Sequence, residues 1–120
     1  MSVTLQLFCP GKVTSPMNRR THWTERSLWA SEWRQRVRLV WLERGRPMWD
    51  GPALFTFTAY VARLYDSDNL PPALKPVRDE AVACICGTDD GPRSGHQFVY
   101  KQVVRPAYRG VLIEVSERAG

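Results

Sequence analysis

The sequence predicts an α+β domain in which a single mixed β-sheet of about four strands carries two packed helices, in the order β-α-β-α-β-β. Two patterns support this prediction: apolar runs of strand length, and apolar residues that recur every three or four positions over longer segments. The chain has 120 residues, of which 43% are hydrophobic and 24% charged. This length suits one domain, which we expect to span residues 1–120.

The first half of the chain predicts a strand, a loop and a long helix. Residues 2–8 alternate apolar and polar side chains, as does a strand with one buried face. Residues 9–23 contain two prolines and a glycine without periodicity and predict an exposed loop. A helix capped by Thr24 and ending near Gly45 should follow, because one face of it is apolar: Trp29, Trp33, Val37, Val40 and Trp41. These tryptophans could stack on nucleic-acid bases, but their helical spacing favours core packing.

The second half predicts a strand, a helix and two further strands. Residues 53–65 are rich in aromatic and β-branched side chains. Because a proline inside a helix lacks the N–H of its turn, we expect a tight turn over 71–74 and a regular helix that begins at Lys75 or Pro76 and ends at Gly87. Residues 95–105 and 109–117 predict two strands joined as a hairpin, with Pro106 in the turn.

Composition narrows the class of protein. No apolar run approaches the roughly 18 residues that cross a membrane, and the N-terminal sequence MSVTLQLFCPGK has no basic leader. We therefore expect a cytoplasmic protein without a membrane partner. The cysteines are odd in number and should be reduced. A zinc site made of Cys84, Cys86 and His96 would need a fourth ligand, which the spacing does not offer.

The charges are unevenly distributed along the chain. The net charge is +5, and the basic residues are 14 arginines against 3 lysines. Eight arginines lie between Arg19 and Arg46, whereas six of the twelve acids lie between Asp66 and Asp90. Arginine pairs bidentately with phosphate, so this split favours a basic surface for a polyanion and an acidic cluster for a cation. Ordinary solvated faces are the alternative for either cluster alone.

The acidic cluster centres on LYDSDNLPPALK, residues 64–75. If the preceding strand continues to Asp68, then Asp66 and Asp68 project from the same side, roughly 6 to 7 Å apart. Carboxylate oxygens suit magnesium, and also manganese, and a magnesium site needs only a few of them. Asp90, with Asp89 beside it, could supply a third carboxylate, and Lys75 could neutralise charge on a scissile phosphate. For the aspartate pair taken alone, an acidic surface turn is an equally good interpretation.

Other motifs that contain similar residues do not fit. A calcium loop beginning at Asp66 would need glycine at position 71 and glutamate at position 77, where the chain has Pro71 and Val77. Neither a G-x-x-x-x-G-K nor a G-x-G-x-x-G nucleotide-binding motif occurs. The two histidines are not accompanied by a nucleophile-elbow pattern. Metal-dependent cutting of nucleic acid is the function that the remaining pattern favours.

Several of these segments resemble the RusA family of Holliday-junction resolvases, which are small phage and prophage endonucleases of DNA recombination and repair. The resemblance is carried by DSDNL at residues 66–70, by Lys75 and Asp79, by TDD ending at Asp90, and by SPMNRRTHW at residues 15–23. Chain length and the order of elements also match, so the resemblance covers nearly the whole chain and implies a RusA-like fold.

The resemblance implies roles for individual residues. Asp66, Asp68 and Asp90 take the places of the three carboxylates that bind magnesium, and Lys75 takes the place of the catalytic lysine. The DNA-contacting residues would be Asn18, Arg19, Arg20, Arg63 and Asn69. The chain departs from the family in the PPAL insertion before Lys75 and in having the single Arg63 before the aspartates.

Together, the residues and the resemblance predict a magnesium-dependent, structure-specific DNA endonuclease. It would resolve four-way junctions and related branched DNA by paired cleavage, as a homodimer. A protein that keeps the fold and binds nucleic acid without cutting it is one alternative. A metal-dependent nuclease that acts on flaps or RNA is another.

Overall fold

The computed structural model describes residues 5–14, 23–87 and 95–118, apart from the side chains of residues 23 and 24. Its elements are β1 (Leu5–Pro10), α1 (Trp23–Glu43), β2 (Ala53–Val61), α2 (Leu70–Cys86), β3 (Gln97–Val104) and β4 (Gly110–Glu117). One mixed sheet of four strands carries two helices. The predicted fold class and element order are thus confirmed.

The strands lie in the order β1-β4-β2-β3. β4 pairs antiparallel with both β1 and β2, and β3 pairs parallel with β2. The predicted hairpin between residues 95–105 and 109–117 is therefore wrong, because β2 separates the two strands. α2 supplies the crossover that a parallel pair such as β2 and β3 requires.

Burial explains why β4, and not β3, takes the inner place in the sheet. Three side chains of β4, Val111, Ile113 and Val115, are fully buried. On β3 the side chains on the helix-covered side, including Phe98 and Tyr100, are only partly buried. A central strand removes more apolar surface from water than an edge strand does, so the sequence with the more apolar inner face is stabilised there.

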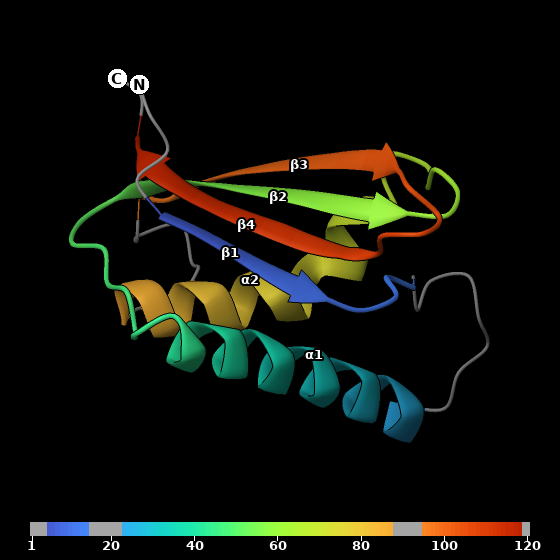
Figure 1. Cartoon of the computed structure of the whole chain (residues 1–120), viewed down its shortest axis with the longest axis horizontal. Helices are drawn as coiled ribbons and strands as arrows, with labels where there is room; N and C mark the ends of the chain where they lie inside the picture. The colour runs from blue at the N-terminus through green and yellow to red at the C-terminus, as the bar shows by residue number, and fades with distance from the viewer. Residues whose placement is uncertain (1–4, 15–22, 88–94, 119–120) are drawn as a thin grey trace.

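Both helices cover the same face of the sheet, as Figure 1 shows. The core between the helices and the sheet includes Phe55 and Phe57 of β2 and Trp33 and Val37 of α1. The remaining members of the predicted apolar face of α1 are partly buried against this core: Trp29, Val40 and Trp41. The core interpretation of the tryptophans at positions 29, 33 and 41 is confirmed. Within the described part of the chain, neither helix is long and apolar enough to cross a membrane.

Helix boundaries differ from the prediction at the N-terminal ends. α1 begins at Trp23, one residue before the predicted cap. α2 begins at Leu70 instead of Lys75 or Pro76, so residues 71–74 are helical and not a separate turn. Pro71 and Pro72 fall in the first turn, where backbone N–H groups have no partner inside the helix and their loss costs little. Pro76 lies inside the helix and is buried, so core packing outweighs the backbone hydrogen bond that it removes.

The C-terminal end of α2 agrees with the prediction. Gly87 adopts the left-handed conformation, with φ of 66°, and its N–H donates to the carbonyl of Ala83. This conformation is available to glycine at little cost, which is why the helix ends there.

Candidate functional site

The two central aspartates lie on a turn after β2 and not on the strand itself. β2 ends at Val61, so the predicted continuation of the strand to Asp68 is wrong. β2 ends there because both strands that pair with it end at the same level. Val61 faces the last residue of β3, and Tyr60 faces the first residue of β4. Asp66 and Asp68 are exposed, and the N–H of Asn69 donates to the carbonyl of Asp66 at 2.9 Å. One turn thus carries both carboxylates.

Tyr65 anchors this turn to the rest of the protein. Its N–H donates to Oε1 of Gln102 on β3, and its carbonyl accepts from Nε2 of the same side chain, both at 2.8 Å. Its hydroxyl donates to the carbonyl of Val13 in the segment after β1. The residue directly before Asp66 is therefore fixed at its main chain and at the tip of its ring. This attachment gives the aspartate turn a defined position at the end of β2.

Asn69 occupies the N-cap position of α2 but makes no capping hydrogen bond with its side chain. A capping side chain accepts from the N–H of the second or third helical residue. Here these residues are Pro71 and Pro72, and neither has an N–H. The prolines therefore remove the usual structural role of the Asn69 amide, which suits its predicted role as a substrate contact.

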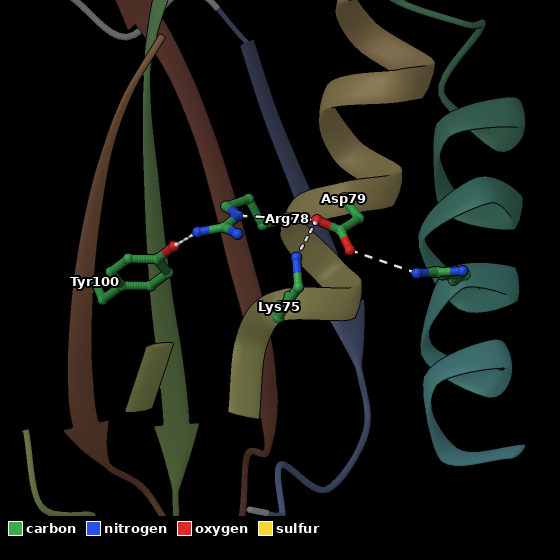
Figure 2. Close-up of polar contacts among 5 residues, drawn as sticks. Lys75, Arg78, Asp79 and Tyr100 are labelled. Atoms are coloured by element: carbon green, nitrogen blue, oxygen red, sulfur yellow. Dashed lines mark hydrogen bonds and ion pairs between the residues drawn. The ribbon is translucent and has the colours of Figure 1, made fainter. Parts of the chain in front are cut away.

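Lys75 lies in the second turn of α2 and pairs with Asp79. Its Nζ is 3.3 Å from Oδ1 of Asp79, and the Nε of Arg78 is 3.9 Å from the same oxygen (Figure 2). Arg34 of α1 reaches the other oxygen of Asp79 at 3.4 Å. Figure 2 also shows Arg78 donating to the hydroxyl of Tyr100 on β3, at 2.8 Å. Asp79 thus neutralises cations from two helices.

Part of the uneven charge pattern has a structural explanation. Arg34 pairs with Asp79, and Arg38 donates to Glu80 at 3.0 Å, so two arginines of α1 meet two acids of α2. The hydrogen bond to Glu80 raises the pKa of Arg38 above its usual value. These four residues form ion pairs between α1 and α2, which is a structural role for part of both charge clusters.

The other predicted site residues lie outside the described part of the chain: Asn18, Arg19, Arg20, Asp89 and Asp90. The described residues on either side of the last two are Gly87 and Gly95. Near Gly87, the carbonyl of Ile85 accepts from the N–H of Trp49, and Gly95 lies against Pro52. Both contacts are with residues just before β2, whereas Asp66 follows its other end (Figure 1). β2 has nine residues, so its first and last residues lie roughly 27 Å apart.

The donor chemistry on the turn fits a hard cation. Asp66 and Asp68 offer carboxylate oxygens, and these are the ligands that magnesium and manganese take. Within residues 5–14, 23–87 and 95–118, no group of three or more His, Cys, Asp or Glu side chains is arranged to hold a metal ion. The described turn therefore carries two of the carboxylates predicted as ligands.

A cavity of about 430 Å³ adjoins the aspartate turn. Three of the described residues that line it are cationic, and none of them is acidic. Its lining consists of Lys12, Val13, Tyr60, Val61, Ala62, Arg63, Leu64, Tyr65 and Arg109. Asp66 follows this lining directly in the chain. A basic cavity next to exposed acids is an arrangement that can hold a phosphate group beside a cation.

Comparison with known proteins does not assign the chain to a family. No protein-family model matches the chain, and no curated protein matches its sequence. The resemblance to the RusA family stays a prediction that depends on the motifs.

Of the three cationic residues that line the cavity, Arg63 is a predicted site residue, whereas Lys12 and Arg109 are not. These two are single basic residues with no periodic or motif context, and they reach the cavity because β1 and β4 are neighbours in the sheet. The N–H of Gly11 donates to the carbonyl of Arg109 at 3.2 Å, which fixes the two segments side by side. Their proximity could have been predicted only from the pairing of β1 with β4.

Aromatic residues at the same end of the sheet were also missed. Tyr108 stacks on Phe8 with ring centroids 4.8 Å apart, and Tyr60 packs edge-on against Tyr108. The guanidinium of Arg105 lies 6.0 Å from the Tyr60 ring centroid. Because Tyr60 also lines the cavity, this cluster supports one of its walls.

The zinc alternative receives no support from the described residues. Burial, followed by a hydrogen bond to Glu80, raises the pKa of Cys84 to about 11, and burial also raises that of Cys86. Zinc binds the thiolate, which these environments disfavour. Nδ1 of His96 accepts from the N–H of Ala53, so one of its two ring nitrogens is engaged in the fold.

Proposed function

We propose that this protein is a magnesium-dependent, structure-specific DNA endonuclease that resolves four-way junctions and related branched DNA as a homodimer. The observation that carries the proposal is the position of the Asp66 turn beside the basic cavity. Exposed carboxylates suit a cation, and adjacent arginines suit the phosphates of a nucleic acid. The motifs shared with the RusA family narrow the substrate from nucleic acid in general to branched DNA.

In this proposal, different described residues bind the cation and the phosphates. Asp66 and Asp68 hold the cation, and Lys12, Arg63 and Arg109 bind phosphates on the strand that enters the site. Magnesium bound there would polarise the phosphodiester and offset the charge that develops on its oxygens. The hydrogen bonds between Gln102 and Tyr65 fix the start of the turn that carries the carboxylates. The RusA resemblance adds Asp90 as a further ligand and Asn18, Arg19 and Arg20 as DNA contacts.

Lys75 can serve the reaction in spite of its pairing with Asp79. An exposed pair of this helical spacing contributes only about 0.3 to 0.5 kcal/mol, and the Lys75 side chain is 59% exposed. A phosphate can therefore compete for the ammonium group at small cost. Asp79 keeps Arg34 and Arg78 as partners when Lys75 turns away. In the proposal, Lys75 moves from Asp79 to the phosphate undergoing cleavage.

One observation favours the non-catalytic alternative. Gly87 and Gly95, the described residues nearest in sequence to Asp89 and Asp90, lie at the end of the sheet opposite to Asp66. A protein that binds junctions without cutting them would need the basic cavity but no complete metal site. The two functions differ in whether a junction is cut when magnesium or manganese is present.

Cleavage of a synthetic four-way junction tests the proposal. With magnesium, the protein should make paired cuts at opposed strands, and EDTA should abolish them. Asp68→Asn should lower the cleavage rate at least about 100-fold and leave junction binding in calcium within about twofold, because the carboxylate serves the metal and not the fold. Asp50→Asn is the matched control, since Asp50 is an exposed aspartate before β2, far from the turn.

The outcomes separate the candidates. Cutting that resists both EDTA and Asp68→Asn would refute the metal site. Tight junction binding without cutting in magnesium or manganese would favour the non-catalytic binder. Preferential cutting of flaps or RNA would favour the general nuclease. Light scattering of the complex should give two protein chains per junction, and a single chain would refute the dimer.

A further inference from the structure

The basic cavity has features that phosphate binding alone does not require. Its cationic groups come from Lys12, Arg63 and Arg109, but its remaining described lining is aromatic or aliphatic, including Tyr60 and Leu64. A phosphate on the surface of a duplex needs only the cations. Apolar and aromatic walls favour a planar group that is taken out of water.

The walls of the cavity are held in place before any ligand arrives. The hydroxyl of Tyr65 donates to the carbonyl of Val13, which joins two of the lining residues directly. The N–H of Arg105 donates to the carbonyl of Val61 at 2.8 Å, and Gly11 donates to Arg109 at 3.2 Å. The cavity is therefore built on three segments that hydrogen bonds tie together, two of them between backbone groups and one through the Tyr65 hydroxyl. Small-molecule sites are typically of this kind, with volumes of about 300 to 1,000 Å³.

We propose that this cavity binds one unpaired nucleotide of the DNA substrate, with the base against Tyr60 and the aliphatic walls and the phosphate on the cations. The proposal rests on the nuclease function proposed above and deepens it by assigning a second element of substrate recognition. A base inside a duplex cannot enter a cavity until it leaves its partner, and this costs least where pairing is already interrupted. A branch point is such a place.

The position of the cavity gives the bound nucleotide a role in placing the cut. Arg63, Leu64 and Tyr65 line the cavity, and Asp66 follows them directly. A nucleotide seated there would set which phosphodiester reaches the carboxylates. Cleavage would then occur at a fixed distance from the branch point, because an unpaired base is found only near it.

Amide NMR of the metal-free protein tests the cavity itself, with the dinucleotide pTpT as the probe. Saturable shifts are expected at residues 12–13, 60–65 and 109. Arg63→Ala should weaken binding about tenfold, as expected for loss of a charge-assisted contact. Arg44→Ala is the matched control: it removes the same charge from an exposed residue just after α1, and binding should stay the same. Ala62→Phe should block the cavity and abolish binding without changing the charge.

Separate titrations with inorganic phosphate and with thymidine identify what is recognised. Both should bind at least about tenfold more weakly than pTpT, because each fills only part of the cavity. Phosphate binding as tight as pTpT would overturn the base-binding proposal, as would equal pTpT affinity in wild type and Ala62→Phe. Shifts that never saturate, or that lie elsewhere, would also overturn it.

A fluorescent base connects the cavity to the junction. We expect 2-aminopurine at one position beside the branch point to change intensity when the protein binds in calcium, and the change should disappear in Ala62→Phe. If junctions bind but no position responds, the cavity does not take a junction base. If pTpT binds and no junction is ever cut, the nuclease proposal fails while the nucleotide site stands.

Discussion

Replacing Gln102 with leucine should loosen the turn that carries Asp66 and Asp68. The Gln102 amide makes two hydrogen bonds to the main chain of Tyr65, both at 2.8 Å, and leucine can make neither. Each such bond contributes a net 0.5 to 1.5 kcal/mol, so the free energy of unfolding should fall by about 2 kcal/mol. Gln102 is on β3 and Tyr65 follows β2, so the two lost hydrogen bonds are those that attach the aspartate turn to the sheet.

The effect on cleavage should be larger than the effect on stability. A displacement of catalytic groups by about 1 Å can cost 100-fold in rate, whereas a domain with 5 to 15 kcal/mol of stability stays folded after losing 2. We therefore expect Gln102→Leu to lower the junction cleavage rate about 100-fold at a temperature where urea titration shows it to be folded. Gln97→Leu is the control, because Gln97 lies at the opposite end of the same strand.

A second variant at this position sharpens the test. Gln102→Glu keeps an acceptor for the Tyr65 N–H but places a carboxylate against the Tyr65 carbonyl, so it should fall between wild type and Gln102→Leu at neutral pH. Protonation of the new carboxyl below about pH 4 would restore a donor and narrow the stability gap to wild type. The reasoning is refuted if Gln102→Leu matches Gln97→Leu in both urea midpoint and cleavage rate.

Two further predictions concern the fold around the site. Gly110→Ala should destabilise the protein by about 1 to 3 kcal/mol in thermal unfolding. The reason is that a Cβ there would contact the Phe8 ring and lie 2.6 Å from the carbonyl oxygen of Cys9. An unchanged melting temperature would show that β1 can move aside. Burial lowers the pKa of His96 below 6.5, so the unfolded chain binds more protons and stability should decrease as the pH falls through 6.5. Urea midpoints at pH 7.5 and 5.5 measure this decrease, which should be smaller in His96→Asn; an equal decrease would assign it to other groups.

Local patterns were sufficient to predict the elements but not all of their boundaries. The apolar face of α1, the aromatic run of β2 and the glycine that ends α2 are set by neighbours in sequence, so periodicity and conformational preference predict them. The predicted start of α2 is wrong because it assigns Pro76 to the first turn. Pro71 and Pro72 satisfy that rule equally well, and the burial of Leu70, Ala73 and Leu74 decides in favour of the earlier start.

Strand pairing could not be predicted from local patterns, because it depends on which strands bury the most surface together. Two strands separated by a short, proline-containing turn are typical of a hairpin. In this protein β4 passes β2 and pairs on its far side. The residues of the site that sequence reasoning missed, Lys12 and Arg109, are those whose neighbours depend on this pairing.

The unexpected connection between β3 and β4 also explains why the basic cavity exists. A hairpin would leave β3 and β4 adjacent and the end of β2 uncovered. Because β4 lies on the other side of β2, the chain from Arg105 to Arg109 must cross the end of β2, and the N–H of Arg105 donates to Val61 there. This crossing brings Arg109 to the cavity that Arg63 also lines, and it packs Tyr108 against the ring of Tyr60. The turn with Asp66 leaves β2 at the same end, so one topological feature places the proposed cation ligands and the proposed nucleotide site side by side.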